Sequence, residues 1–279
     1  MRASWDKFGR SATKRGRLTV NNVARTQDRT QQGQPATAAH DARLVPARSL
    51  PIADPPPLRL VAFPLKQTAF FVCDIQERFR LVIHAYPAVI ATAEKMLKAA
   101  KLMDVPVIAT EQNPKAAPPR PNPHAPKTAL VALGATVPLP LLDLPSHLRP
   151  SWVPLAKTKF SMIVPQVEQQ LKEWETKSVV LMGIESHVCV LQTALDLLER
   201  DIDVHVLADG ISSCNGDEVG IAIKRMRDAG AQITTSESIL FQIMQDAAHP
   251  GFKAMAGLVK EHKEMTKDAL EKLIAGRGF

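Results

Sequence analysis

The sequence predicts an α/β protein, specifically a three-layer α/β/α fold around a six-stranded, mostly parallel, Rossmann-like sheet. Short apolar runs, typical of strands that are buried on both faces, alternate along the chain with longer segments of helical periodicity. Hydrophobic residues make up 45% of the 279 residues and aromatic residues only 5%, which suits an aliphatic core between a sheet and its helices. Strands and helices that alternate in this way imply right-handed βαβ crossovers, and therefore a parallel sheet.

The elements follow in order from the first strand, 68–74 (TAFFVCD), a continuous apolar run that ends in a carboxylate. The further predicted strands are 105–110, 153–157, 178–183, 203–208 and the edge-like 231–235. The predicted helices are 87–104, 164–175, 187–200, 217–229, 236–246 and 260–275. Pro87 suits the first turn of its helix, because the amide hydrogen that proline lacks would be unpaired there anyway. Gly230 suits the position just after a helix end.

Composition divides the chain into four parts. Residues 1–50 form a basic tail, 51–66 a Pro-rich linker, 67–250 the α/β domain with a Pro-rich insertion at 113–154, and 251–279 a helical extension. The tail is rich in Arg and poor in acids, which is typical of a mitochondrial transit peptide and also of a disordered extension without an address. We predict a mitochondrial location on this basis, and a cytoplasmic one if the tail is only an extension.

The tail also holds all of the excess charge. Residues 1–50 contain eight Arg, two Lys and three Asp, which accounts for the +7 of the whole chain, so residues 51–279 are neutral overall. Charge therefore gives no reason to expect a polyanionic ligand on the domain, and the low aromatic content argues against base stacking. Nucleic acid is not an expected partner, and an RNA-processing role that uses the basic tail is the weakest alternative.

The three cysteines, Cys73, Cys189 and Cys214, are few and show no paired spacing. This pattern favours a reducing compartment over a disulfide framework. The sequence has no CxxC or HExxH motif, so we expect no structural zinc site. No apolar run reaches 18 residues, so we expect no transmembrane helix and no membrane partner.

Polar residues fall at three points where parallel strands are predicted to end, which is the edge at which open α/β sheets bind ligands. Asp74 ends the first strand, where a buried carboxylate needs either a partner or a function. Its alternative role is the N-cap of the segment that follows. Lys157 ends the third strand, but it shares strand parity with Lys159. The pattern alone does not choose between the two lysines, and a solvated surface lysine is the ordinary alternative.

Cys189 follows the fourth strand at the start of a helix, where free amides and the helix dipole favour a thiolate and can supply an oxyanion hole. The alternative is an ordinary buried cysteine. Together the three groups would form a nucleophilic site. Asp74 would accept the thiol proton, Lys157 would stabilise negative charge, and Cys189 would attack an electrophilic carbon.

Three neighbouring residues receive plainer interpretations. Because side chains alternate along a strand, we predict that Cys73 points away from Asp74, to the opposite side, as a core thiol. Cys214 lies in a loop and is expected to be idle. His187, two residues before Cys189, faces another direction at a helix start and is expected to have a structural role or to lie at the rim of the site.

Three motifs carry a resemblance to a known family. The motifs D-x-Q-x-x-F (74–79), K-x-x-F-S (157–161) and G-I-E-S-H-V-C-V-L-Q-T (183–193) resemble those of the isochorismatase-like hydrolases, in particular the eukaryotic isochorismatase domain-containing proteins. The resemblance spans about residues 65–246. It implies the same six-stranded fold, an Asp74–Lys157–Cys189 triad in which the K-x-x-F-S spacing selects Lys157, no cofactor, and a homo-oligomer.

The resemblance also implies the surroundings of the nucleophile. It implies a non-proline cis peptide between Ile184 and Glu185, which would direct the amides of Glu185 and Cys189 into an oxyanion hole. Substrate binding is assigned to Gln76, Phe79, Gln112 and Phe160.

The sequence departs from the family pattern at two places. Family members that hydrolyse nicotinamide have an Asp-x-His-x-His metal cluster after the second strand, whereas residues 110–114 here read TEQNP, so we predict no metal. Many members have a small residue where this chain has Glu185, which puts isochorismate in doubt as the substrate. We predict a metal-independent cysteine hydrolase for a small carbonyl or enol-ether type substrate. The alternative is a catalytically idle scaffold that acts as an interaction protein.

Overall fold

The computed structural model describes residues 67–113, 136–137, 139–141, 143–151 and 154–277. The predictions made for the basic tail, the linker and most of the Pro-rich insertion lie outside the described residues. The mitochondrial location therefore stays a prediction.

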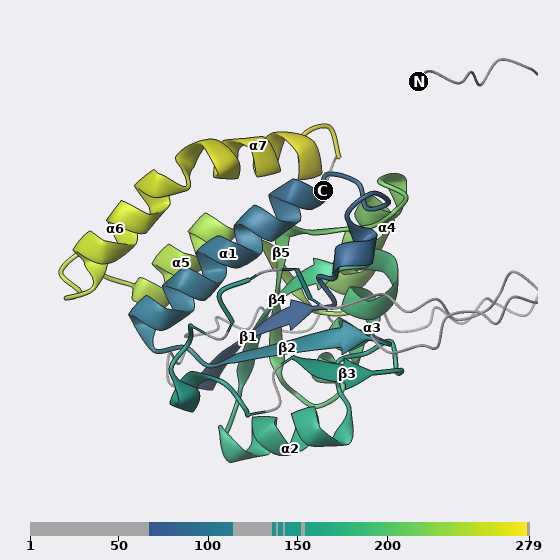
Figure 1. Ribbon diagram of the computed structural model, residues 1–279, viewed down its shortest axis with the longest axis horizontal. Coiled ribbons are helices and arrows are strands. Elements are labelled where there is room, and N and C mark those ends of the chain that lie inside the picture. Colours follow the sequence, from purple (N-terminus) through teal and green to yellow (C-terminus); the bar gives the residue numbers. More distant parts are fainter. Residues whose placement is uncertain (1–66, 114–135, 138, 142, 152–153, 278–279) are drawn as a thin grey trace, which may run out of the picture. The chain divides into compact units, whose positions relative to one another are not determined.

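The centre of the described domain is a sheet of six parallel strands in the order β3-β2-β1-β4-β5-β6. The strands are β1 (Thr68–Cys73), β2 (Val107–Gln112), β3 (Leu155–Lys157), β4 (Ser178–Ile184), β5 (Asp203–Ser212) and β6 (Gln232–Thr234). The six-stranded α/β fold predicted from the apolar runs is confirmed (Figure 1).

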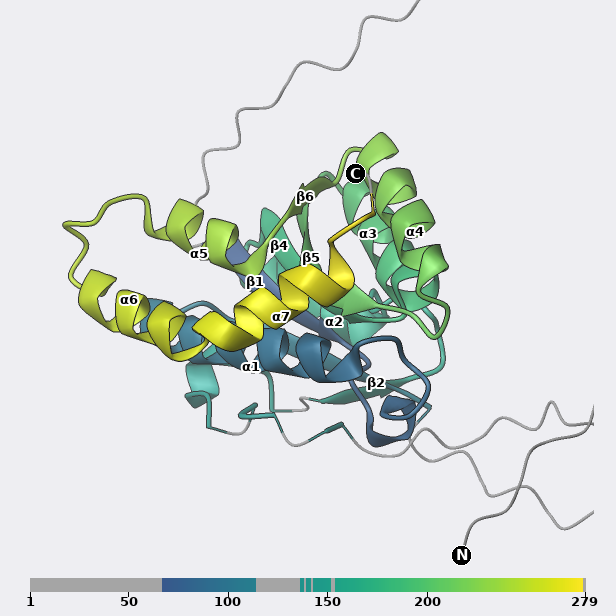
Figure 2. The same cartoon turned by 90° about the horizontal axis from the view of Figure 1, so that it is seen from above.

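Helices cover both faces of this sheet. The helices are α1 (Tyr86–Met103), α2 (Pro165–Glu173), α3 (Leu191–Leu198), α4 (Asp217–Asp228), α5 (Ser236–Met244), α6 (Phe252–Glu261) and α7 (Lys263–Leu273). Short turns of helix also occur at η2 (Glu77–Phe79), η3 (Ser146–Leu148) and the π-helical η4 (Ser186–Val190). Helices α1, α6 and α7 lie side by side in both views (Figures 1 and 2).

The alternation of side chains along β1 assigns each face to its helices. Phe70 and Val72 belong to one core cluster, with buried residues of α1, α5, α6 and α7. Ala69 and Phe71 belong to the other, with buried residues of α2, α3 and α4. Every residue of β1 is buried, as expected for a strand with helices on both sides. The result is the three-layer arrangement that the sequence predicts.

The C-terminal part differs in detail from the prediction. Where one helix was expected from residue 260, the chain forms α6 and α7, which meet at His262. Most of α6, at 252–259, was not predicted as a helix; it buries Met255 and Leu258. Helix α7 packs against α1 and β5, and its buried side chains join the same core cluster as those of α1.

The topology places a ligand-binding edge between β1 and β4. The chain runs from β1 through β2 to β3 on one side and then returns to β4 on the other. In open α/β sheets such a reversal of direction leaves a crevice at the carboxyl ends of the strands. Within the described ranges, no helix is both long enough and apolar enough to cross a membrane.

Candidate active site

The crevice is formed where β1 and β4 pair closely. Cys73 pairs with Gly183 in the register of these strands. Gly183 has a φ of 121°, and a Cβ at this position would lie 2.1 Å from the carbonyl oxygen of Cys73. Only glycine therefore permits this approach. Strand β1 ends at Cys73, directly before Asp74, and β4 ends at Ile184, shortly before the turn η4 that carries Cys189.

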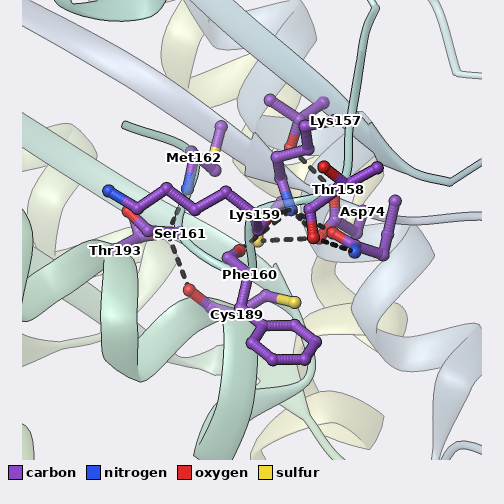
Figure 3. A network of polar contacts seen from close by, with 12 residues as sticks. Asp74, Lys157, Thr158, Lys159, Phe160, Ser161, Met162, Cys189 and Thr193 are labelled. Carbon is purple, nitrogen blue, oxygen red and sulfur yellow. Dashed lines mark hydrogen bonds and ion pairs between the residues drawn. The ribbon is translucent and has the colours of Figure 1, made fainter. Parts of the chain in front are cut away.

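Asp74 and Lys157 form a buried ion pair at this point. Lys157 Nζ donates to Asp74 Oδ2 at 2.7 Å, and each side chain is only 1% exposed. Figure 3 shows the two side chains directed toward one another. The other oxygen, Asp74 Oδ1, accepts from Thr110 Oγ1 at 2.8 Å. Both oxygens of the carboxylate therefore accept hydrogen bonds, one from Thr110 on β2 and one from Lys157 on β3.

Further acceptors surround the ammonium of Lys157. Lys157 Nζ also donates to Gln112 Oε1 at 2.7 Å and to the carbonyl oxygens of Phe160 at 2.9 Å and Lys159 at 3.1 Å. Burial disfavours the charged ammonium. Electrostatic interactions with Cys73, Asp74 and Cys189, together with the hydrogen bond to Asp74, outweigh burial and raise the pKa of Lys157. Lys157 is therefore a fixed positive charge beside both thiols.

Cys189 lies in the π-helical turn η4. The sequence predicted the first turn of an α-helix instead. It is 7% exposed and lines a pocket of about 230 Å³. The other lining residues are Asp74, Phe79, Gln112, Phe160, Ile184, Glu185 and Val188. The peptide bond between Ile184 and Glu185 is cis, as the resemblance implied.

Cys73 is a buried core thiol, as predicted, but it also contacts the site, so the prediction that it points away from Asp74 is wrong. Its Sγ lies 3.6 Å from Asp74 Oδ2. Burial, a hydrogen bond to Cys189 and the charge of Asp74 raise the pKa of the Cys73 thiol well above its ordinary value. The strand rule failed because Asp74 has a left-handed φ of 49°, so regular alternation ends at Cys73 and both side chains lie on the same side.

The second lysine of the motif lies outside this cluster. Lys159 Nζ pairs with Asp196 Oδ2 on α3 at 2.6 Å, and its side chain is half exposed. Between the lysine segment and α3, Thr193 makes a second link. Its Oγ1 accepts from the backbone N of Met162 at 2.9 Å and donates to the carbonyl oxygen of Cys189 at 2.6 Å (Figure 3). Thr193 therefore fixes the turn that carries Cys189 against the segment that follows Lys157.

Comparison with known proteins identifies the family. A family model described as the isochorismatase domain matches residues 68–238. Human isochorismatase domain-containing protein 2 is 41% identical over 196 residues, which cover 70% of this chain and 83% of that protein. The chain belongs to the isochorismatase family.

Solved structures agree with this membership. A structure titled as the MAR1 ribonuclease from Caenorhabditis elegans is 38% identical, with a TM-score of 0.62, and the match covers 72% of this chain and 93% of that one. YcaC from Escherichia coli, described as an octameric hydrolase of unknown specificity, has a TM-score of 0.59 at 19% identity and covers 75% and 95% of the two chains. The second likeness shows the shared fold.

Three of the four residues assigned to substrate binding line the pocket of this isochorismatase-family chain. These are Phe79, Gln112 and the half-exposed Phe160. Gln76 is fully buried and does not line the pocket. Its Nε2 donates to the carbonyl oxygen of Gln112, and its Oε1 accepts from the backbone N of Gln112. Gln76 therefore positions the end of β2, and the assignment of substrate contact to it is corrected.

His187 and Glu111 also have hydrogen-bond partners. His187 Nδ1 lies 2.9 Å from Ser213 Oγ, which fits the structural role expected for it. Glu111 Oε1 accepts from both the backbone N and Oγ1 of Thr136. The carboxylate of Glu111 therefore ties Thr136, a described residue of the insertion, to the end of β2. No group of three metal-ligating side chains occurs among the described residues.

Proposed function

We propose that this isochorismatase-family chain is a cysteine hydrolase of a small carbonyl or enol-ether type substrate, and that its chemistry needs no metal. The observation that carries the proposal is the buried Asp74–Lys157 pair, which lies beside Cys189 at the wall of a pocket. A buried ion pair contributes little net stability to a fold, which favours a functional role for these two charges. If Cys189 must become a thiolate, Asp74 can accept its proton and Lys157 can stabilise the negative charge.

The chemistry follows from these positions. Asp74 accepts the proton of the Cys189 thiol, and the positive charge of Lys157 stabilises the resulting thiolate. The sulfur attacks the substrate carbon, and the backbone amides of Glu185 and Cys189 stabilise the oxyanion that develops. Asp74 returns the proton to the leaving group. It then takes a proton from the water that cleaves the thioester and passes this proton to the departing sulfur, which restores the Cys189 thiol.

Oligomerisation is the second part of the proposal. YcaC shares the fold and is described as octameric. The segment after η2 in this chain exposes two adjacent apolar side chains, Leu81 at 95% and Val82 at 56%. We propose a homo-oligomer that uses this segment. Light scattering after size-exclusion chromatography should give a multiple of the 30.5 kDa chain mass. A monomer at micromolar concentration would contradict this part.

The name of the C. elegans structure does not extend to this chain. RNA hydrolysis would require phosphate groups to enter the pocket, but two of its described lining residues, Asp74 and Glu185, carry carboxylates and none is cationic. Negative potential at a reaction site disfavours a polyanionic substrate.

The test is a comparison of small-molecule turnover between the full-length protein and its Cys189→Ser variant. Both are incubated with a panel of small amides, esters and enol ethers, and with a metabolite extract, and hydrolysis products are followed by mass spectrometry. We expect at least one compound to be consumed by the wild type and at least ~10³-fold more slowly by the variant. Glu264→Gln, on the exposed surface of α7, is the control and should retain full turnover. Equal consumption by the wild type and Cys189→Ser would contradict the proposal.

A further inference from the structure

The pocket of the proposed hydrolase contains more negative than positive charge. Asp74 is neutralised by Lys157, which lies 2.7 Å away. Glu185, which also lines the pocket, takes part in none of the ion pairs found among the described residues. When Asp74 takes the proton of Cys189, the positive charge of Lys157 offsets the thiolate, and the charge of Glu185 remains as the one in the pocket that no ion pair offsets.

The carboxylate of Glu185 is held in place by a neighbouring loop. Its Oε2 accepts from the backbone N of Cys214 at 2.9 Å. A hydrogen bond from the Cys214 thiol to the same carboxylate raises the pKa of that thiol, and partial burial adds to this effect. Both contacts come from the loop between β5 and α4. Glu185 is half-buried, so its charge is less screened by water than that of an exposed carboxylate.

We propose that Glu185 selects the substrate by charge, so that the pocket takes small uncharged or cationic carbonyl compounds and rejects those that carry a carboxylate. This inference rests on the proposed hydrolase function and narrows its substrate class. A substrate carboxylate a few ångströms from Glu185 would be repelled in a partly buried site, whereas an N–H donor there would be favoured. The pocket volume of about 230 Å³ lies below the roughly 300–1,000 Å³ of pockets for drug-sized ligands, which limits the substrate to a small molecule.

Two alkylating agents test the selection without knowledge of the substrate. Iodoacetamide and iodoacetate are similar in size and react alike, since the thiolate sulfur displaces iodide and forms one S–C bond, but only iodoacetate carries a negative charge. Each cysteine lies in a separate tryptic peptide, 67–78 for Cys73, 178–200 for Cys189 and 201–224 for Cys214. Mass spectrometry of these peptides therefore gives the rate at Cys189 alone.

The measured quantity is the ratio of the iodoacetamide rate to the iodoacetate rate at Cys189, divided by the same ratio for glutathione. We expect about tenfold or more for the wild type, the size of one repulsive contact in a medium of intermediate dielectric constant. Glu185→Gln should lower this normalised ratio most of the way to one, the value expected without charge selection. Glu264→Gln, which removes an equal charge from the exposed surface of α7, should leave it unchanged.

The alkylation rates separate a failure of charge selection by Glu185 from a failure of Cys189 as the nucleophile. If Cys189 reacts readily with both reagents at the glutathione ratio, or if Glu185→Gln leaves the ratio as it is, charge selection is wrong and the nucleophile stands. If neither reagent modifies Cys189 while Cys214 is modified, the nucleophile itself is wrong and the selection falls with it.

Discussion

Lys157 Nζ lies 2.7 Å from Asp74 Oδ2 with both side chains 1% exposed, so neither charge can be removed alone without leaving the other buried and unpaired. We therefore predict that Lys157→Met lowers the free energy of unfolding by ~3–5 kcal/mol. The double variant Asp74→Asn/Lys157→Met should recover much of this loss without recovering turnover. Urea denaturation measures the stability.

Lys159 supplies the matched control for this experiment. It lies two residues away and also forms an ion pair, but its side chain is 49% exposed. Lys159→Met should therefore cost no more than ~1 kcal/mol. If Lys157→Met and Lys159→Met lower the free energy of unfolding by similar amounts, the buried ion pair contributes no more to stability than the exposed one.

Thr193 is predicted to be a positioning residue for the nucleophile. Thr193→Val removes the acceptor of the Met162 backbone N–H, which is buried, and should destabilise the protein by ~1–3 kcal/mol. Because the same hydroxyl bonds the carbonyl oxygen of Cys189, alkylation of Cys189 should also slow relative to that of Cys214. Thr193→Ser keeps the hydroxyl and should restore both values. If alkylation is unchanged in Thr193→Val, Thr193 stabilises the fold only.

Gly183 is predicted to tolerate no side chain. In Gly183→Ala the new Cβ would meet the Cys73 carbonyl oxygen at 2.1 Å, so β1 and β4 would have to separate at the site. We expect a loss of at least ~3 kcal/mol in unfolding free energy. Gly220→Ala in α4 is the control, since nothing lies within 4 Å of the added Cβ, and alanine there should stabilise the helix by ~0.5–1 kcal/mol. A mild effect at position 183 would contradict the close approach.

His205 on β5 is predicted to make stability depend on pH. Burial lowers the pKa of His205 from 6.5 to about 4, so the unfolded chain binds a proton at higher pH than the folded protein does. The contribution to stability is complete above pH 6.5 and is lost as pH falls toward 4, by up to ~3 kcal/mol. Denaturation midpoints of wild type and His205→Gln should converge at low pH. A constant difference between pH 7 and 4 would refute this.

The sheet and the buried pair of Asp74 and Lys157 could be predicted because their signals are local in the sequence. Buried parallel strands are continuous apolar runs, and Asp74 is the carboxylate that ends one of them. The strand-end rule brought Asp74, Lys157 and Cys189 together, and the motif spacing then chose Lys157 over Lys159. In the structure, Lys157 pairs with Asp74 whereas Lys159 pairs with Asp196.

Other features left no signal that the sequence alone could reveal. The left-handed backbone at Asp74 brings Cys73 into the cluster, but no sequence pattern indicates that conformation. Thr110 and Thr193 act through single hydroxyl groups, which no spacing rule distinguishes from other threonines. Strand β5 continues through Asp209 and Gly210, a pair that resembles a turn, because Asp209 is bonded to the backbone N of Ser236.

The central claim, that Cys189 is an activated nucleophile, is tested most directly by competition between two thiols of one molecule. Cys189 is 7% exposed whereas Cys214 is exposed, so exposure alone predicts that Cys214 reacts first. We predict the reverse at pH 7, with iodoacetamide modifying the Cys189 peptide at least ~10-fold faster, since thiolate content governs the rate. Modification of Cys214 first, with Cys189 left intact, would show that Cys189 is not an activated nucleophile.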